Sequence, residues 1–151
     1  MRNLLLRSLT LVVLAAPATG AQTPRDTAAA DAKLERVVAD YVGLYRRETL
    51  DAWEQLFLPT FTAANTRADG TVAVRTREEF FDAQRRYHAR VDGLREDLEH
   101  VRIERNGSLA SVWADFVVTD SGRKNRGKLV LLIIDDNGAY KIHSLMFAYD
   151  R

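Results

Sequence analysis

The chain has 151 residues, no cysteine, and 22 lysine and arginine residues against 21 aspartate and glutamate residues. Without cysteine it can form neither a disulfide framework nor a lipoprotein anchor, so a folded domain must be held together by packing. The near-neutral charge argues against non-specific nucleic-acid binding, which depends on a clear basic excess.

The first 21 residues are built like a secretory signal peptide. Arg2 and Arg7 supply a basic start, residues 9–16 form an apolar centre, and small residues precede an expected cut after Ala21. The apolar run is shorter than the roughly 20 residues that a membrane span needs. We expect an exported protein, periplasmic or secreted, with no membrane attachment after cleavage; an uncleaved anchor is the alternative. Cleavage removes two of the 22 basic residues and no acidic one, leaving 20 against 21, a net charge of −1.

Residues 22–30 are small and polar, which predicts a flexible leader before a single domain over residues 31–151. Helical spacing of apolar residues begins after Asp31, an expected N-cap, and includes Tyr41 and Tyr45. A second, shorter helix is expected after Thr49 and before Pro59.

Two short strands are expected at residues 60–65 and 71–74, around the turn signal Asp69-Gly70. Thr76 and Glu79 then have the spacing of a capping box, which predicts a third helix that ends at Asp92-Gly93.

The last third of the chain predicts a meander of strands, with turns at 106–107, 121–122 and 137–138. Counting from two-residue turns gives the expected pairs Ile103 with Ala110, Val101 with Val112, Leu131 with Ser144, and Leu129 with Met146. One face of this sheet is then apolar and faces the helices. That face is Val101, Ile103, Ala110, Val112, Ala114, Phe116, Leu129, Leu131, Ile133, Tyr140, Ile142, Ser144 and Met146.

The opposite face is also rich in apolar residues, and no segment is left in the chain to cover it. We expect a second copy of the protein to cover it, giving a homodimer. The residues expected at this dimer face are His100, Trp113, Val130, Leu132, His143 and Leu145.

The order helix, short helix, small hairpin, capped helix and long strands, together with three local stretches, resembles one known superfamily. The stretches are residues 110–116 (Ala-Ser-Val-Trp-Ala-Asp-Phe), Gly127 before an apolar strand, and residues 138–142 (Gly-Ala-Tyr-Lys-Ile). They resemble the C-terminal half of nuclear transport factor 2-like proteins, with Tyr140 at the aromatic position of a Gly-x-Trp-Lys-Ile pattern. The nearest likeness is to small exported proteins described as SnoaL-like or lumazine-binding-like.

This resemblance implies an α+β, cone-shaped fold with N-terminal helices packed on a curved antiparallel sheet. It also implies a conical pocket, frequent dimers through the sheet, and either small-molecule binding or simple acid–base catalysis. The catalytic branches place a carboxylate or a His–Asp pair in the pocket, often beside a helix tyrosine. Tyr41 and Tyr45 match that tyrosine, but the strand positions of the isomerases' aspartate hold Ala114, Phe116 and Leu131.

The candidate pocket is aromatic, although aromatic residues at helical spacing are also typical of an ordinary core. The residues expected to line it are Tyr41, Tyr45, Trp53, Phe80, Tyr87, Phe116, Ser144 and Met146. Glu99 is the one acid that the expected register points inward, where burial would raise its pKa and suit it to proton transfer. The alternative is a carboxylate at the rim, paired with an arginine, and Asp51 is a second candidate.

The three histidines show no spacing typical of a metal site, and the sequence indicates neither a metal nor a cofactor. His88 is expected among arginines on a solvated side of its helix.

Three functions stay open at this point. The first is binding of a small apolar or aromatic molecule, the second a lyase or isomerase using a pocket carboxylate and a tyrosine, and the third a protein-interaction module.

Overall fold

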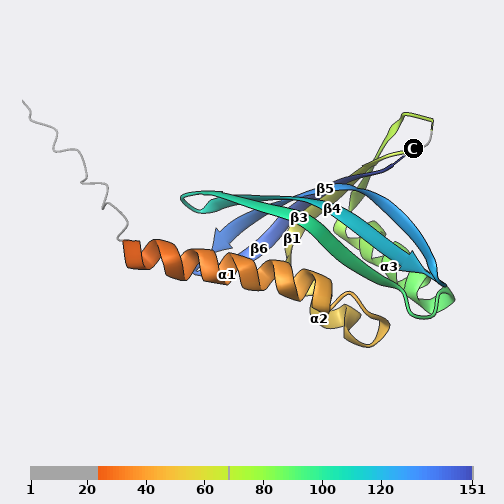
Figure 1. The fold of residues 1–151 in the computed structure, drawn as a ribbon, viewed down its shortest axis with the longest axis horizontal. Coiled ribbons are helices and arrows are strands. Elements are labelled where there is room, and N and C mark those ends of the chain that lie inside the picture. The colour runs from red at the N-terminus through yellow and green to blue at the C-terminus, as the bar shows by residue number, and fades with distance from the viewer. Residues whose placement is uncertain (1–23, 68, 151) are drawn as a thin grey trace, which may run out of the picture.

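The computed structural model describes residues 24–67 and 69–150, and shows three helices packed on a curved six-stranded sheet (Figure 1). The elements are α1 (Pro24–Gly43), the 3-10 turn η1 (Arg47–Thr49), α2 (Leu50–Glu54), β1 (Phe57–Thr66), β2 (Val72–Thr76), α3 (Arg77–Arg90), β3 (Arg95–Asn106), β4 (Leu109–Asp120), β5 (Arg123–Asp136) and β6 (Ala139–Tyr149). The expected α+β fold with a curved sheet is confirmed.

The strand order is β2-β1-β6-β5-β4-β3, and all neighbours are antiparallel except β1 and β6, which are parallel. Helix α1 packs against β3 and β6, while α3 packs against β1 and β2. The side chains between the helices and the inner face of the sheet form one apolar core. Burial of this core is the main stabilising contribution in a chain without disulfides.

Helix α1 starts earlier than its apolar spacing indicates. It begins at Pro24. Proline suits the first turn of a helix because backbone N–H groups there have no acceptor within the helix, so the N–H that proline lacks costs no hydrogen bond. Residues 24–30, expected as a flexible leader, are helical. Asp31 is therefore not an N-cap; its Oδ1 instead accepts a hydrogen bond from Nε of Arg105 at 2.9 Å. The expected signal peptide lies outside the described residues.

The capping box that opens α3 is confirmed. The Thr76 hydroxyl accepts from the backbone N–H of Glu79, and the Glu79 carboxylate accepts from the backbone N–H of Thr76. The expected place of His88 on this helix is wrong. His88 is only 2 % exposed, and its ring lies edge-on to Tyr45 with 4.6 Å between the ring centroids.

The register between β3 and β4 differs from the expected one for two reasons. The turn pairs Asn106 with Leu109, so that Ile103 faces Val112 and not Ala110. A bulge then lies between Glu99 and Arg102, where His100 adopts a positive φ of 53°. One extra residue reverses the alternation of faces, so the residues of β3 before the bulge point opposite to the expectation.

A second bulge, in β6, has the same effect. The expected pair Ile133 with Ile142 is present, but Leu132 then faces Ser144 and Leu131 faces Leu145, which leaves His143 as the extra residue. The expected pairs of Leu131 with Ser144 and of Leu129 with Met146 are therefore wrong.

Within the described residues, no helix is both long enough and apolar enough to cross a membrane.

Candidate functional site

A cavity of about 80 Å³ lies between the helices and the inner face of the sheet. Its lining combines eight aromatic residues with one carboxylate, one amide and three aliphatic side chains. The lining residues are Tyr41, Tyr45, Trp53, Phe80, Gln84, Tyr87, Glu96, Phe116, Val118, Leu129, Leu145, Phe147 and Tyr149.

Glu96 of β3 is the only acidic residue of this lining. Its Oε1 is buried and has no hydrogen-bond partner among the described residues. Burial raises the pKa of Glu96 to about 7, and its hydrogen bond with the Tyr41 hydroxyl acts in the opposite direction. A carboxyl group with a pKa near 7 is suited to both donating and accepting a proton at neutral pH.

The tyrosines around Glu96 hold fixed positions. The Tyr45 hydroxyl donates to Oε1 of Gln84 at 2.6 Å, and the Tyr87 hydroxyl donates to Oδ2 of Asp120 at 2.9 Å. Burial is the largest cause that raises the pKa of Tyr41 and of Tyr45 above the ordinary value. Both hydroxyl groups therefore stay protonated at neutral pH.

The structure brings together six of the eight residues expected to line a pocket. Tyr41, Tyr45, Trp53, Phe80, Tyr87 and Phe116 all line the cavity. Ser144 and Met146 do not, because the bulge in β6 turns Leu145 and Phe147 inward in their place. Met146 is 47 % exposed and lies on the other face of the sheet.

Neither expected catalytic carboxylate lies in the cavity. Glu99 is exposed, and its Oε2 accepts from Nη1 of Arg126 at 2.9 Å, because the bulge at His100 reverses its direction. The Asp51 side chain is 96 % exposed, 3.7 Å from Nη2 of Arg85. The inward carboxylate is Glu96, which the sequence interpretation missed; only the bulge position would have identified it.

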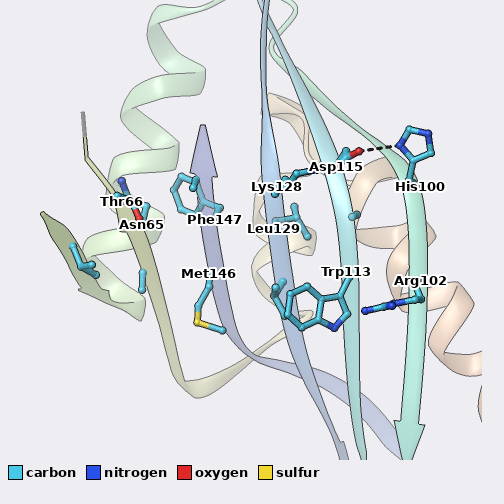
Figure 2. A pocket seen from close by; sticks show the side chains of 15 residues that line it. Asn65, Thr66, His100, Arg102, Trp113, Asp115, Lys128, Leu129, Met146 and Phe147 are labelled. Carbon is cyan, nitrogen blue, oxygen red and sulfur yellow. Dashed lines mark hydrogen bonds and ion pairs between the residues drawn. The ribbon is translucent and has the colours of Figure 1, made fainter. Parts of the chain in front are cut away.

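The outer face of the sheet carries an open groove of about 620 Å³ (Figure 2). Trp113 of β4 and Met146 of β6 lie on either side of β5, and the Arg102 guanidinium lies 5.8 Å from the centroid of the Trp113 ring. Asp115 accepts from Lys128 at 2.6 Å, and Nδ1 of His100 lies 2.9 Å from its other oxygen.

Four of the six residues expected at the dimer face lie on this outer surface or around the groove: His100, Trp113, Val130 and Leu132. Leu145 does not, because it is 4 % exposed and lines the internal cavity. His143 is half-buried at the bulge of β6.

Among the described residues, no group of three or more histidine, aspartate or glutamate side chains is arranged to hold a metal ion.

Comparison with known proteins gives one family. Residues 34–147 match the family model of the SnoaL-like domain. No curated protein matches the sequence.

Several solved structures are similar. One is a protein of unknown function from Mycobacterium tuberculosis, with 21% identity, a TM-score of 0.69, and coverage of 87% of this chain and 79% of that one. Another is a putative dehydratase of the NTF2-like family from Streptomyces avermitilis, with 11% identity, a TM-score of 0.69, and coverage of 83% and 99%. A third is an NTF2-like protein of unknown function from Shewanella baltica, with 16% identity, a TM-score of 0.64, and coverage of 82% and 96%. At these identities the likeness shows the fold alone.

Proposed function

The chain belongs to the SnoaL-like domain family, and from that premise we propose that its internal cavity binds a small molecule of largely apolar character. The observation that carries the proposal is the cavity itself, in which aromatic side chains surround a single carboxylate without a basic partner. An ordinary core disfavours a buried carboxylate without a counter-ion, because an ionised group without an opposite charge costs free energy on burial.

Proton transfer to or from the bound molecule is the second candidate function, as in a lyase or isomerase. Glu96 favours it, because its pKa of about 7 lets the carboxyl group act as acid or base. The Tyr41 hydroxyl, hydrogen-bonded to Glu96, would hold the Glu96 carboxyl group in position while the charge of that group changes.

The binding proposal is tested by nuclear magnetic resonance with a panel of small uncharged, cationic and anionic compounds, alongside mass spectrometry of any molecule that co-purifies. We expect at least one compound to shift the resonances of Tyr41, Phe116 and Leu145. The same compound should leave exposed residues of the outer face unshifted. A panel that moves none of the cavity resonances would contradict the proposal.

The proton-transfer candidate is tested in deuterated water on the compounds that bind. We expect the protein to incorporate deuterium at an acidic carbon of at least one bound compound, and the variant Glu96→Gln to lose this activity while remaining folded. The matched control is Glu99→Gln on the same strand, which should keep it. Exchange that persists in Glu96→Gln would exclude Glu96 as the group that moves the proton.

We further propose that the outer face of the sheet mediates self-association. Trp113 pairs in register with Val130, which pairs with Met146, so the three side chains form one apolar stripe across neighbouring strands. Trp113 and Met146 are 45% and 47% exposed, which is unusual for large apolar residues in a contiguous patch. Light scattering should give the mass of a dimer for the native chain and of a monomer for Trp113→Glu.

The control for this substitution is Val74→Glu on β2, a residue that is also exposed but does not line the groove. A native chain that is monomeric would favour a different protein as the partner of this face.

Export is the remaining proposal. The basic start, apolar centre and small residues of positions 1–21 support it. Sequencing the N-terminus of protein from the extracytoplasmic fraction should give Gln22 as the first residue; an intact Met1 in that fraction would contradict cleavage.

A further inference from the structure

Four of the six lining residues that carry a side-chain hydrogen-bond donor use it within the protein, and the Tyr149 hydroxyl and the Gln84 amide N–H groups remain. The Tyr45 hydroxyl donates to Gln84, the Tyr87 hydroxyl donates to Asp120, and the Trp53 indole N–H donates to the carbonyl of Tyr41 at 2.8 Å. The Tyr41 hydroxyl hydrogen-bonds to Glu96. What these groups leave for a ligand is mainly oxygen lone pairs, so the cavity offers more acceptors than donors.

The charge of the lining points the same way. The described residues that line the cavity include the Glu96 carboxylate but no lysine, arginine or histidine. Eight of the thirteen are aromatic, and aromatic rings attract cations through the negative charge of their faces. An anionic ligand would meet a carboxylate there without a counter-ion, whereas a cation would compensate it.

We infer that the ligand of this cavity is a small organic cation, an ammonium group on a compact apolar body, with Glu96 as its counter-ion. The inference rests on the proposed binding function and narrows it to one charge class. A volume of about 80 Å³ is roughly half that of the apolar cavity of about 150 Å³ that accommodates benzene. The expected ligand is therefore smaller than benzene.

The test compares isopropylammonium with isopropanol, which are smaller than benzene and have the same shape and the same number of non-hydrogen atoms but differ in charge. By calorimetry near pH 8, the ammonium should bind the native protein at least about tenfold more tightly than the alcohol. The carboxylate acetate, with the same number of non-hydrogen atoms, should not bind measurably. In the variant Glu96→Gln, the two isosteres should bind within about twofold of each other.

A second readout needs no variant. The titratable groups that act on Glu96 are Tyr41 of α1, Tyr45 just beyond it, Tyr149 of β6 and the neighbouring Asp97. The tyrosines stay neutral below pH 8, so the preference for the ammonium should fall between about pH 8 and pH 5 as Glu96 takes up a proton. This measurement still decides the matter if Glu96→Gln fails to fold.

The outcomes separate the two proposals. Tight binding of isopropanol with no preference for the ammonium, or a preference that does not change with pH, overturns the inference and leaves the binding function standing. Binding of neither isostere, together with no shift of the cavity resonances by any compound, overturns both. A preference for the ammonium that is lost in Glu96→Gln and at low pH supports both.

Discussion

The Tyr41 hydroxyl of α1 hydrogen-bonds to the Glu96 carboxylate of β3, and this bond lowers a pKa that burial raises to about 7. The contact links the first helix to a strand more than fifty residues later and places a tyrosine beside the one acidic group of the cavity. A phenol that stabilises the ionised carboxylate opposes the effect of burial.

Replacing Tyr41 by phenylalanine should therefore raise the pKa of Glu96 further, because the ionised form loses its hydrogen bond. Carbon-detected titration of the Glu96 carboxyl resonance measures the change. Tyr45→Phe is the matched control, since the Tyr45 hydroxyl donates to Gln84 and not to Glu96. A pKa that falls in Tyr41→Phe, or that rises equally in both variants, would contradict this account.

Replacing Glu96 by glutamine should change how stability depends on pH. The folded-state pKa of Glu96 lies above its ordinary value of 4.5, so its contribution to stability is fully present below about pH 4.5 and is lost as pH rises through about 7. Relative to the native chain, Glu96→Gln should thus gain up to about 3 kcal/mol in the free energy of unfolding between pH 4 and pH 8.

Urea unfolding of both proteins across this range measures the difference. The control Glu99→Gln removes an exposed carboxylate from the same strand and should show a much smaller change, because Glu99 pairs with Arg126 at the surface. A difference between the native chain and Glu96→Gln that is flat with pH would mean that Glu96 is not desolvated.

The order of the elements could be predicted from the sequence, because apolar spacing, the Thr76–Glu79 capping box and the glycine turns each depend on nearby residues. The face of the sheet to which each side chain of β3 and β6 points could not be predicted. Each bulge adds one residue and reverses the alternation beyond it, and His100 at a φ of 53° carries no glycine or asparagine signal for such a conformation. Glu96 therefore points into the cavity where Glu99 was expected, and in β6 Phe147 does so where Met146 was expected. The expected aromatic residues of α1, α2 and α3 lie around the cavity, because helical spacing is insensitive to these bulges.

Replacing Thr76 by alanine should lower the free energy of unfolding by about 1 kcal/mol, because the first turn of α3 loses a hydrogen-bond acceptor for the Glu79 N–H. Thr60→Ala, at an exposed position of β1, is the control. Thermal unfolding at fixed pH measures both. Equal stabilities would show that water replaces the cap without loss.

Among the glycines that the structure describes, Gly127 of β5 is the one whose position leaves no room for a side chain. A Cβ there would lie 2.5 Å from Cζ of Phe116 and closer still to the backbone oxygen of Ala148. Because the Phe116 ring packs edge-on against Tyr149 and the Ala148 oxygen belongs to the neighbouring strand, neither can move without cost. Gly127→Ala should lower the free energy of unfolding by about 2 kcal/mol or more.

The control for this substitution is Gly43→Ala at the end of α1, where a Cβ would meet nothing within 4 Å. Alanine there should be neutral or stabilise by up to about 1 kcal/mol, because it restricts the unfolded chain. Since the Phe116 ring must shift in Gly127→Ala, that variant should also alter the resonances of Phe147 and Tyr149, whose rings lie 6.2 and 5.2 Å from it. Unchanged stability with unchanged ring resonances would contradict the close contact of Gly127 with the Phe116 ring and with β6.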